Sequence, residues 1–313
     1  MSGSRRADRD TLTSGMEPGI IRGLGTAIVT PFHPNESVDH ASLKKLVEAQ
    51  IAGGVDFLVA CGSTGEASTL SEEETDAVIA TVIEAAKGRI PVIAGCTHNS
   101  TREAVRRATH IAKIDGLTGI LTANPYYNKP NQQGQYLHFK AIADAVAPMP
   151  VLLYNIQGRT AANLEPATAV KLAALPNVIG IKESSGSLAQ IGELLSLAPA
   201  SFAVFSGDDY LALPIIAAGG VGLISVASNV APKQVSQLTR AAVAGDAHAA
   251  REAAKLLHGL TTVLFAEPNP APTKALLAMM GVIADDALRL PMIPVTETTR
   301  EKLRAVAGPL GLL

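Results

Sequence analysis

The stretch Val178–Gly186, VIGIKESSG, decides the fold of this chain, because four residues typical of a buried strand lead directly into a lysine. Lysine is among the side chains least often fully buried. Similar five-residue apolar runs recur along the chain: TAIVT (26–30), DFLVA (56–60), PVIAG (91–95), GILTA (119–123), VLLYN (151–155), FAVFS (202–206) and GLISV (222–226). Uniformly apolar strands indicate a parallel sheet that is covered on its outer face.

Helical segments alternate with these runs. Ser71 and Glu74 have the spacing of a capping box at the start of one helix, and residues 101–113 and 134–146 have further helical patterns. Eight strand–helix units within about 225 residues predict an α/β fold, a TIM (β/α)₈ barrel. A doubly wound open sheet is the alternative, but the glycine-rich turns lack the GxGxxG fingerprint that such a sheet usually carries.

The same patterns divide the chain. Residues 1–19 are polar and lack the apolar core of a secretory signal, so we expect a disordered N-terminal tail. Residues 20–245 form the predicted barrel and catalytic domain, and residues 246–313, where strands stop, form a predicted C-terminal helical domain. Residues 210–232 carry no charge and are long enough to span a membrane. Pro214 and three glycines interrupt them, which favours a helix, a turn and a strand.

The composition excludes several classes of function. The net charge is −2, so the chain lacks the excess positive charge that would attract nucleic acid. Cys61 and Cys96 lie far apart in sequence, which argues against a disulfide framework and fits a reducing cytoplasm. The seven histidines form no HxH or HxxxH pair, so no local pattern proposes a metal site.

Polar residues gather where the predicted strands end. In a TIM barrel, the carboxyl ends of the strands carry the chemistry. These residues are Ser63, Thr64 and Glu66 after the second run, Tyr126 and Tyr127 after the fourth, Tyr154, Arg159 and Thr160 after the fifth, Lys182 at the end of the sixth, and Asp208 and Asp209 after the seventh. We therefore expect one polar rim at the mouth of the barrel.

Lys182 has two interpretations. An amine is a nucleophile only when neutral, and at an ordinary pKa near 10.4 only about one lysine in a thousand is neutral near physiological pH. An apolar barrel mouth would lower that pKa and favour a Schiff base with a carbonyl substrate. The alternative is a structural salt bridge, for example with Glu183. A tyrosine on the preceding strand favours the chemical role.

The neighbouring groups fit that role. Tyr154 can deliver and remove the protons that imine formation requires, although a core tyrosine is the simpler alternative. The turn GSTGE (62–66) offers backbone N–H groups and two hydroxyls that suit a carboxylate, although it can equally be an ordinary turn. Arg159 can bind a second carboxylate in bidentate fashion, or it can be a solvated loop residue.

These segments resemble the dihydrodipicolinate synthase and N-acetylneuraminate lyase family of pyruvate-dependent class I aldolases. The resemblance runs from about Ile21 to Leu313 and rests on the following motifs: AIVTPF, GSTGEAS, IPVIAG, PYYNKP, HFKAIAD, YNIQGRT, GIKESSG, SGDD, ISV, FAEPNP and LRLPM. Within the family it is most similar to the synthases of diaminopimelate and lysine biosynthesis. The implied reaction condenses pyruvate, held as a lysine Schiff base, with L-aspartate 4-semialdehyde, and needs no cofactor and no metal.

The resemblance also implies a role for each matching residue. Lys182 corresponds to the Schiff-base lysine, Tyr154 to the proton-relay tyrosine and Ser63, usually threonine in the synthases, to the relay hydroxyl. Tyr127 corresponds to the tyrosine that enters the neighbouring subunit's site, which implies a homotetramer built as a dimer of dimers. The implied substrate-binding residues are Thr64 and Gly65 for the pyruvate carboxylate, Arg159 for aspartate semialdehyde, and Gly207 and Ile224 as pocket lining.

The resemblance leaves points open. Gln157 stands where the synthases have proline, which puts the second substrate in question. Another pyruvate aldolase, such as an N-acetylneuraminate or 2-keto-3-deoxy sugar-acid lyase, is therefore the rival, and a non-catalytic keto-acid-binding paralogue is a more remote one. An allosteric lysine cleft is implied by Asn99, Glu103 and Tyr126. This chain differs from lysine-sensitive relatives at Ala67, Glu72 and Thr75, where those relatives tend to have a serine and two histidines. We expect weak or absent lysine inhibition.

Overall fold

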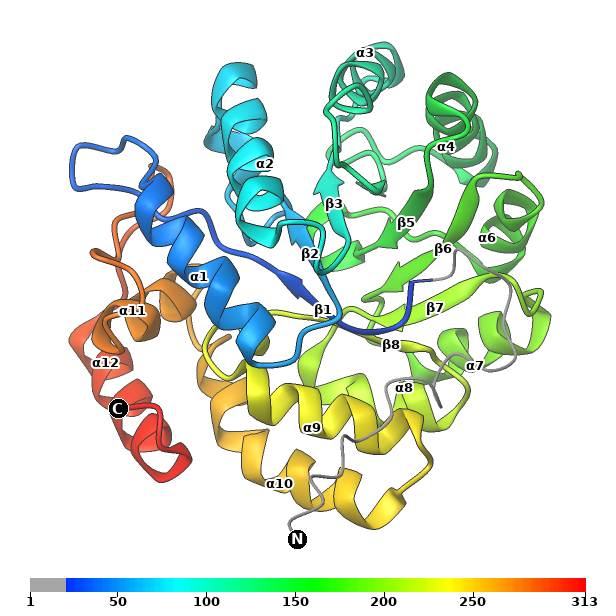
Figure 1. Ribbon diagram of the computed structural model, residues 1–313. Coiled ribbons are helices and arrows are strands. Elements are labelled where there is room, and N and C mark those ends of the chain that lie inside the picture. The colour runs from blue at the N-terminus through cyan, green and yellow to red at the C-terminus, as the bar shows by residue number, and fades with distance from the viewer. Residues whose placement is uncertain (1–20) are drawn as a thin grey trace, which may run out of the picture.

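The computed structural model describes residues 21–313 and contains a closed barrel of eight parallel strands (Figure 1). Each strand pairs with the next, and the last pairs with the first. The strands are β1 (Gly23–Ala27), β2 (Phe57–Ala60), β3 (Val92–Gly95), β4 (Gly119–Ala123), β5 (Val151–Asn155), β6 (Val178–Glu183), β7 (Ala203–Ser206) and β8 (Gly222–Ser225). The predicted TIM barrel is confirmed, and the open doubly wound sheet is wrong.

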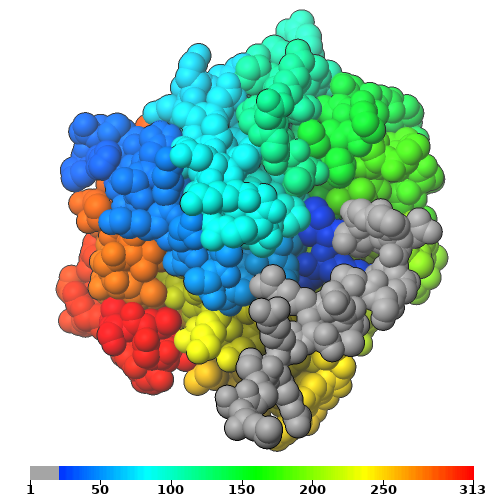
Figure 2. Space-filling view, viewed as in Figure 1, coloured from blue at the N-terminus to red at the C-terminus, as the bar shows by residue number. Residues whose placement is uncertain are grey.

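Helices surround the barrel and extend it at the C-terminal end. They are α1 (His40–Ala52), α2 (Glu72–Ala86), α3 (Thr101–Ile111), α4 (Gln132–Val146), α5 (Gln157–Thr160), α6 (Pro166–Ala173), α7 (Leu188–Leu197), α8 (Ala212–Ala217), α9 (Pro232–Val243), α10 (Ala247–Val263), α11 (Ala271–Met279) and α12 (Glu297–Ala307). The last three lie outside the ring, on the side of α1 and α9 (Figure 1). In the space-filling view, the orange and red C-terminal residues cover one flank beside α1 (Figure 2).

Local sequence signals explain where these elements begin. The capping box before α2 is present: the Ser71 hydroxyl accepts from the Glu74 amide, and the Glu74 carboxylate accepts from the Ser71 amide. The first strand begins three residues earlier than the predicted Thr26 and ends at Ala27. The sequence obscures this strand because glycine has a low strand propensity. Gly25 is required there, since a Cβ at that position would overlap the Phe57 ring.

The barrel interior is filled with side chains. The Phe57 and Phe205 rings meet edge to face at 5.5 Å between centroids, and Ile224 packs in the same buried cluster. This packed layer closes the barrel below its mouth. The polar groups at the ends of the strands therefore face a site with an apolar floor.

The uncharged segment 210–232 forms α8, a turn and β8, as its prolines and glycines predict. Within residues 21–313, no helix combines the length and apolar character needed to cross a membrane. The predicted N-terminal tail, residues 1–19, lies outside the described residues. The division into domains at residue 245 stays a prediction.

Candidate active site

A cavity of about 680 Å³ opens at the carboxyl ends of the strands. Six of the residues selected from the sequence for catalysis or substrate binding line it: Ser63, Thr64, Tyr154, Arg159, Lys182 and Gly207. They come from the ends of β2, β5, β6 and β7, or from the loops that follow these strands. The barrel thus brings together groups that lie up to 144 positions apart, from Ser63 to Gly207.

Lys182 is the buried cation of this cavity. It is only 4% exposed, and it lies opposite Tyr154 in the pairing of β5 with β6. Burial lowers the pKa of its amine to about 8, against the raising effect of the Asp208 and Asp209 carboxylates. At that pKa, about a fifth of the amine is neutral near pH 7.4, compared with about one part in a thousand at the ordinary value.

The structure does not contain the alternative salt bridge between Lys182 and Glu183. Glu183 follows Lys182 on the strand, so its side chain points to the opposite face of the barrel wall. There its carboxylate accepts from Asn155 Nδ2, at 3.1 and 3.2 Å, and from the Ser185 amide at 2.6 Å. Among residues 21–313, no carboxylate lies within 4.0 Å of the Lys182 amine.

Tyr154 lies directly against the lysine. The Lys182 amine is 4.4 Å from the centroid of the Tyr154 ring, and the tyrosine is 7% exposed. Burial raises the pKa of the Tyr154 phenol above its ordinary value, while Arg159 acts in the opposite direction. The phenol is therefore protonated near neutral pH, which lets it donate a proton to an oxygen that forms beside the lysine.

The turn GSTGE crosses the mouth of the barrel from the end of β2. The Gly65 amide donates to the Gly62 carbonyl at 3.0 Å, and the Glu66 amide donates to the Ser63 carbonyl at 3.1 Å. Ser63 is exposed to the cavity, whereas Thr64 is buried at its edge. Gly65 itself does not line the cavity; its carbonyl accepts from the Thr30 hydroxyl at 2.7 Å.

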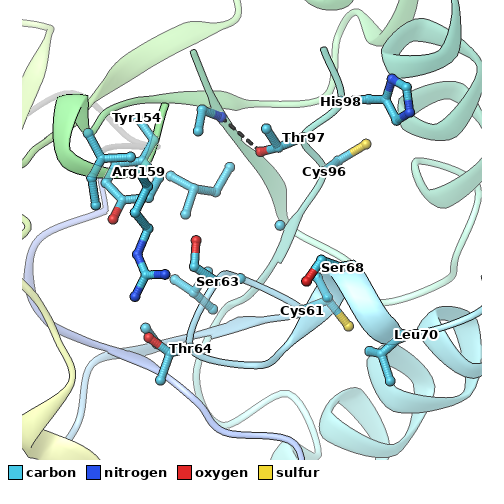
Figure 3. A pocket seen from close by; sticks show the side chains of 18 of the residues that line it. Cys61, Ser63, Thr64, Ser68, Leu70, Cys96, Thr97, His98, Tyr154 and Arg159 are labelled. Atoms are coloured by element: carbon cyan, nitrogen blue, oxygen red, sulfur yellow. Dashed lines mark hydrogen bonds between the residues drawn. The ribbon is translucent and has the colours of Figure 1, made fainter. Parts of the chain in front are cut away.

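Arg159 lies across the cavity from this turn. Figure 3 shows its guanidinium pointing toward Ser63 and Thr64, with the Tyr154 side chain beside it. It is carried by the short helix α5, which begins at Gln157, the position where relatives were expected to have proline. The Thr160 hydroxyl donates to the Ile156 carbonyl at 2.9 Å, so hydrogen bonds hold this loop where a proline ring would otherwise do so.

Asn269 is a further residue of the site, and its local sequence does not predict that role. It lines the cavity, its amide nitrogen donates to the Thr64 hydroxyl at 3.0 Å, and its backbone carbonyl accepts from Arg159 at 3.3 Å. Its side-chain oxygen is buried without a partner among the described residues. Asn269 lies in the quoted motif FAEPNP, but no local pattern connects it with a turn 205 residues earlier.

Gly207 and Ile224 occupy different depths. A Cβ at Gly207 would overlap the Ser184 hydroxyl and lie 3.0 Å from Lys182 Cε, so glycine leaves the space that the lysine uses. Ile224 lies fully buried in the barrel interior, below the cavity rather than in its lining. Tyr127 is 86% exposed and does not line the cavity of its own chain.

The residues of the expected lysine cleft come from α2, from α3 and from the loops that follow β3 and β4. Tyr126 lines the same cavity, which extends past Glu72 and Thr75. Arg106 bridges Glu72, at 2.5 Å, and Glu103, at 2.8 Å. The side chains of this cleft therefore already satisfy one another's charges. The Asn99 carbonyl accepts from Asn128 Nδ2 at 2.9 Å.

No group of three metal-ligating side chains is assembled anywhere in the described part of the chain. Cys61 and Cys96 are separate buried thiols that both line the cavity. Burial raises the pKa of each thiol to about 12, so neither is a thiolate near neutral pH.

Comparisons with known proteins agree with this arrangement. Residues 20–308 match the Dihydrodipicolinate synthetase family. The 4-hydroxy-tetrahydrodipicolinate synthases of Acidobacterium capsulatum and Koribacter versatilis are 54% and 53% identical to this chain, over 94% of it and 97% of each relative. The solved dihydrodipicolinate synthase of Thermotoga maritima is 42% identical, with a TM-score of 0.91, over 94% of this chain and 100% of that one. A dihydrodipicolinate synthase of Acinetobacter baumannii, solved in complex with pyruvate, is 43% identical with the same TM-score and the same shares covered. With a match that spans nearly its whole length, the chain belongs to the dihydrodipicolinate synthetase family.

Proposed function

We propose that this chain is a 4-hydroxy-tetrahydrodipicolinate synthase, which condenses pyruvate with L-aspartate 4-semialdehyde in diaminopimelate and lysine biosynthesis. The observation that carries the proposal is a buried lysine amine with a lowered pKa, held against a protonated tyrosine in a cavity. Such a pair suits imine formation with a keto acid. The identity of 53–54% with synthases over almost the whole chain supports the choice of reaction.

The first half of the reaction uses Lys182 and Tyr154. The neutral amine attacks the keto carbon of pyruvate, and Tyr154 gives a proton to the departing hydroxyl, so that water leaves and an imine forms. The pyruvate carboxylate lies at the turn 62–66, against Thr64, which lines the cavity. The imine withdraws electrons from the neighbouring methyl group, which loses a proton to give an enamine.

In the second half, the enamine carbon attacks the aldehyde of aspartate semialdehyde. Arg159 holds the carboxylate of that substrate from across the cavity. The substrate's own amine then attacks the imine carbon, closes the six-membered ring and releases Lys182. Neither a metal nor an organic cofactor takes part, because the lysine imine serves as the electron sink.

The same proposal includes an oligomer. Tyr127 has a positive φ of 74° and an 86% exposed side chain, an arrangement that suits insertion into a neighbouring subunit. In a homotetramer built as a dimer of dimers, the Tyr127 of one subunit joins Ser63 and Tyr154 of the next in a proton relay. The cytoplasmic location expected from the two unpaired thiols stays a prediction.

A coupled assay tests the activity. Purified protein is mixed with pyruvate and aspartate semialdehyde, and the product is consumed by dihydrodipicolinate reductase with NADPH. We expect steady oxidation of NADPH that depends on both substrates. Faster cleavage of N-acetylneuraminate or of a 2-keto-3-deoxy sugar acid would instead assign the chain to the rival lyases, and no turnover of any of them would favour a keto-acid-binding paralogue.

A further inference from the structure

A fully buried ion pair lies behind the turn 62–66 and joins it to the C-terminal extension. The Lys274 amine, from α11, lies 2.5 Å from the Glu66 carboxylate, and the two side chains are 0% and 2% exposed. Charges removed from water in this way are retained only when their remaining hydrogen bonds are satisfied. This pair lies outside the cavity, so it takes no direct part in the chemistry.

The extension supplies the remaining partners of both charges. The Lys274 amine also donates to the Ala287 carbonyl at 2.8 Å and lies 4.1 Å from the centroid of the Phe32 ring. The second Glu66 oxygen accepts from the Arg289 amide at 3.4 Å. Arg289 in turn binds the Glu74 carboxylate through two bonds of 2.5 and 2.7 Å. The described part of the chain thus surrounds the Glu66 carboxylate with donors from residues 274–289.

Glu66 is held in a conformation that its residue type disfavours. Its φ is 54°, in the left-handed region, where a side chain other than glycine, asparagine or aspartate is uncommon. The Glu66 amide nevertheless closes the turn by donating to the Ser63 carbonyl at 3.1 Å. The strain persists because the surrounding contacts fix it, and one of these contacts is the ion pair with Lys274.

We propose that Lys274 is a positioning residue for the substrate carboxylate. By holding Glu66 from behind, it fixes the turn 62–66 so that Thr64, which lines the cavity, keeps the orientation that the pyruvate carboxylate requires. The extension is then part of the machinery that binds pyruvate, rather than only a cover for α1 and α9. This inference rests on the proposed function, in which that turn binds pyruvate.

The test compares two variants. Lys274→Met removes the amine, and the double variant Lys274→Met/Glu66→Gln removes both charges, so that no unpaired carboxylate stays buried. In each folded variant we expect kcat/KM for pyruvate to fall about 10- to 100-fold through a higher KM, because a small misplacement of a binding turn has an effect of that order. The KM for aspartate semialdehyde should rise less than the KM for pyruvate, because Arg159 lies on another loop and meets the extension through one hydrogen bond, to the Asn269 carbonyl.

A matched control separates positioning from stability. Leu303 is fully buried in α12, which packs on α10 and α11. Leu303→Ala should lower the melting temperature of the protein while leaving the KM for pyruvate at the wild-type value. Both variants and the control are followed by circular dichroism melts.

Every outcome of this test either supports or overturns the proposal. A folded variant with the wild-type KM for pyruvate, an equal rise of both KM values, or a rise of the pyruvate KM in Leu303→Ala would overturn the proposal. A double variant that does not fold would also overturn it, because the pair would then serve folding alone. Borohydride trapping of pyruvate on the wild-type enzyme is run beside them: its failure refutes the proposed function, whereas normal trapping with unchanged variants refutes only this inference.

Discussion

Lys182 carries a cost in stability that its chemistry requires. Burial lowers the pKa of its amine from 10.5 to about 8, so the folded state binds fewer protons than the unfolded state between those two pH values. Stability therefore rises with pH through that window, and below pH 8 the full penalty is present. A difference of this size corresponds to about 3 kcal/mol in favour of the unfolded state near neutral pH.

We expect Lys182→Met to abolish turnover and to stabilise the fold by about 1–3 kcal/mol at pH 7, because it removes a buried charge without removing the packing of the side chain. The gain should decrease as the pH rises from 8 to 10.5. Urea unfolding at three pH values measures it. A variant that is less stable than the wild type at pH 7 would show that the ammonium is well compensated, and the lowered pKa would be wrong.

Gly207 is expected to tolerate no side chain. An added Cβ would overlap the Ser184 hydroxyl and crowd Lys182 Cε, so Gly207→Ala should displace the lysine and reduce the rate of imine formation at least about tenfold. Gly192→Ala, at an exposed helical position with no atom within 4 Å, is the control and should have the wild-type rate. Equal rates in both variants would mean that the lysine has other space available.

Among the elements, strands were easier to predict from the sequence than the contacts between distant loops. β4 and β5 lie at their predicted residues, because uninterrupted apolar runs bounded by turn residues have few other uses. β1 begins earlier than predicted because Gly23 and Gly25, of which Gly25 makes room for Phe57, weaken its strand pattern. Lys182 and Tyr154 could be selected because strand order alone places them on one rim.

Contacts made by the C-terminal extension were not predictable in this way. Asn269 and Lys274 reach the turn 62–66 across more than 200 positions of sequence, and nothing in their local pattern indicates which turn they meet. The side-chain pairing of Glu72 with Arg106 was equally hidden, since a sequence shows the charge of Glu72 but not its direction. Tertiary packing, rather than local propensity, determines such contacts.

The cleft between α2 and α3 predicts weak feedback by lysine. A lysine ligand must compete with Arg106 and Arg107 for the Glu103 carboxylate, each of which lies 2.8 Å from it. We expect half-inhibition only above roughly millimolar lysine, which corresponds to about 4 kcal/mol of binding free energy. Titration of lysine into the coupled assay measures this, and half-inhibition at micromolar lysine would contradict it.

A reciprocal variant strengthens the lysine experiment. Glu72→His together with Thr75→His introduces the residues expected in lysine-sensitive relatives and frees Arg106 from one of its carboxylates. Inhibition should then appear at lower lysine concentrations. Glu84→Gln, on the same helix but paired with Lys44, serves as the control and should leave the titration unchanged.

At the scale of the whole molecule, the exposed Tyr127 predicts shared active sites. Subunits with Lys182→Ala lack the nucleophile, and subunits with Tyr127→Phe lack the relay group that they lend to a neighbour. The two variants are dissociated, mixed and reassembled. In a hybrid pair, one of the two sites has both Lys182 and a neighbour's Tyr127, so hybrid oligomers should regain up to about half of the wild-type activity. A mixture with no more activity than the sum of its parts would confine Tyr127 to its own subunit.

The central claim is that Lys182 forms an imine with pyruvate, and trapping with borohydride tests it most directly. The enzyme is incubated with pyruvate, reduced, digested and analysed by peptide mass. The account predicts one stable pyruvate adduct, on the peptide that contains Lys182, and its loss in Lys182→Met. An adduct on another lysine, such as the buried Lys274, or no adduct on an enzyme that is active in the coupled assay, would contradict the account.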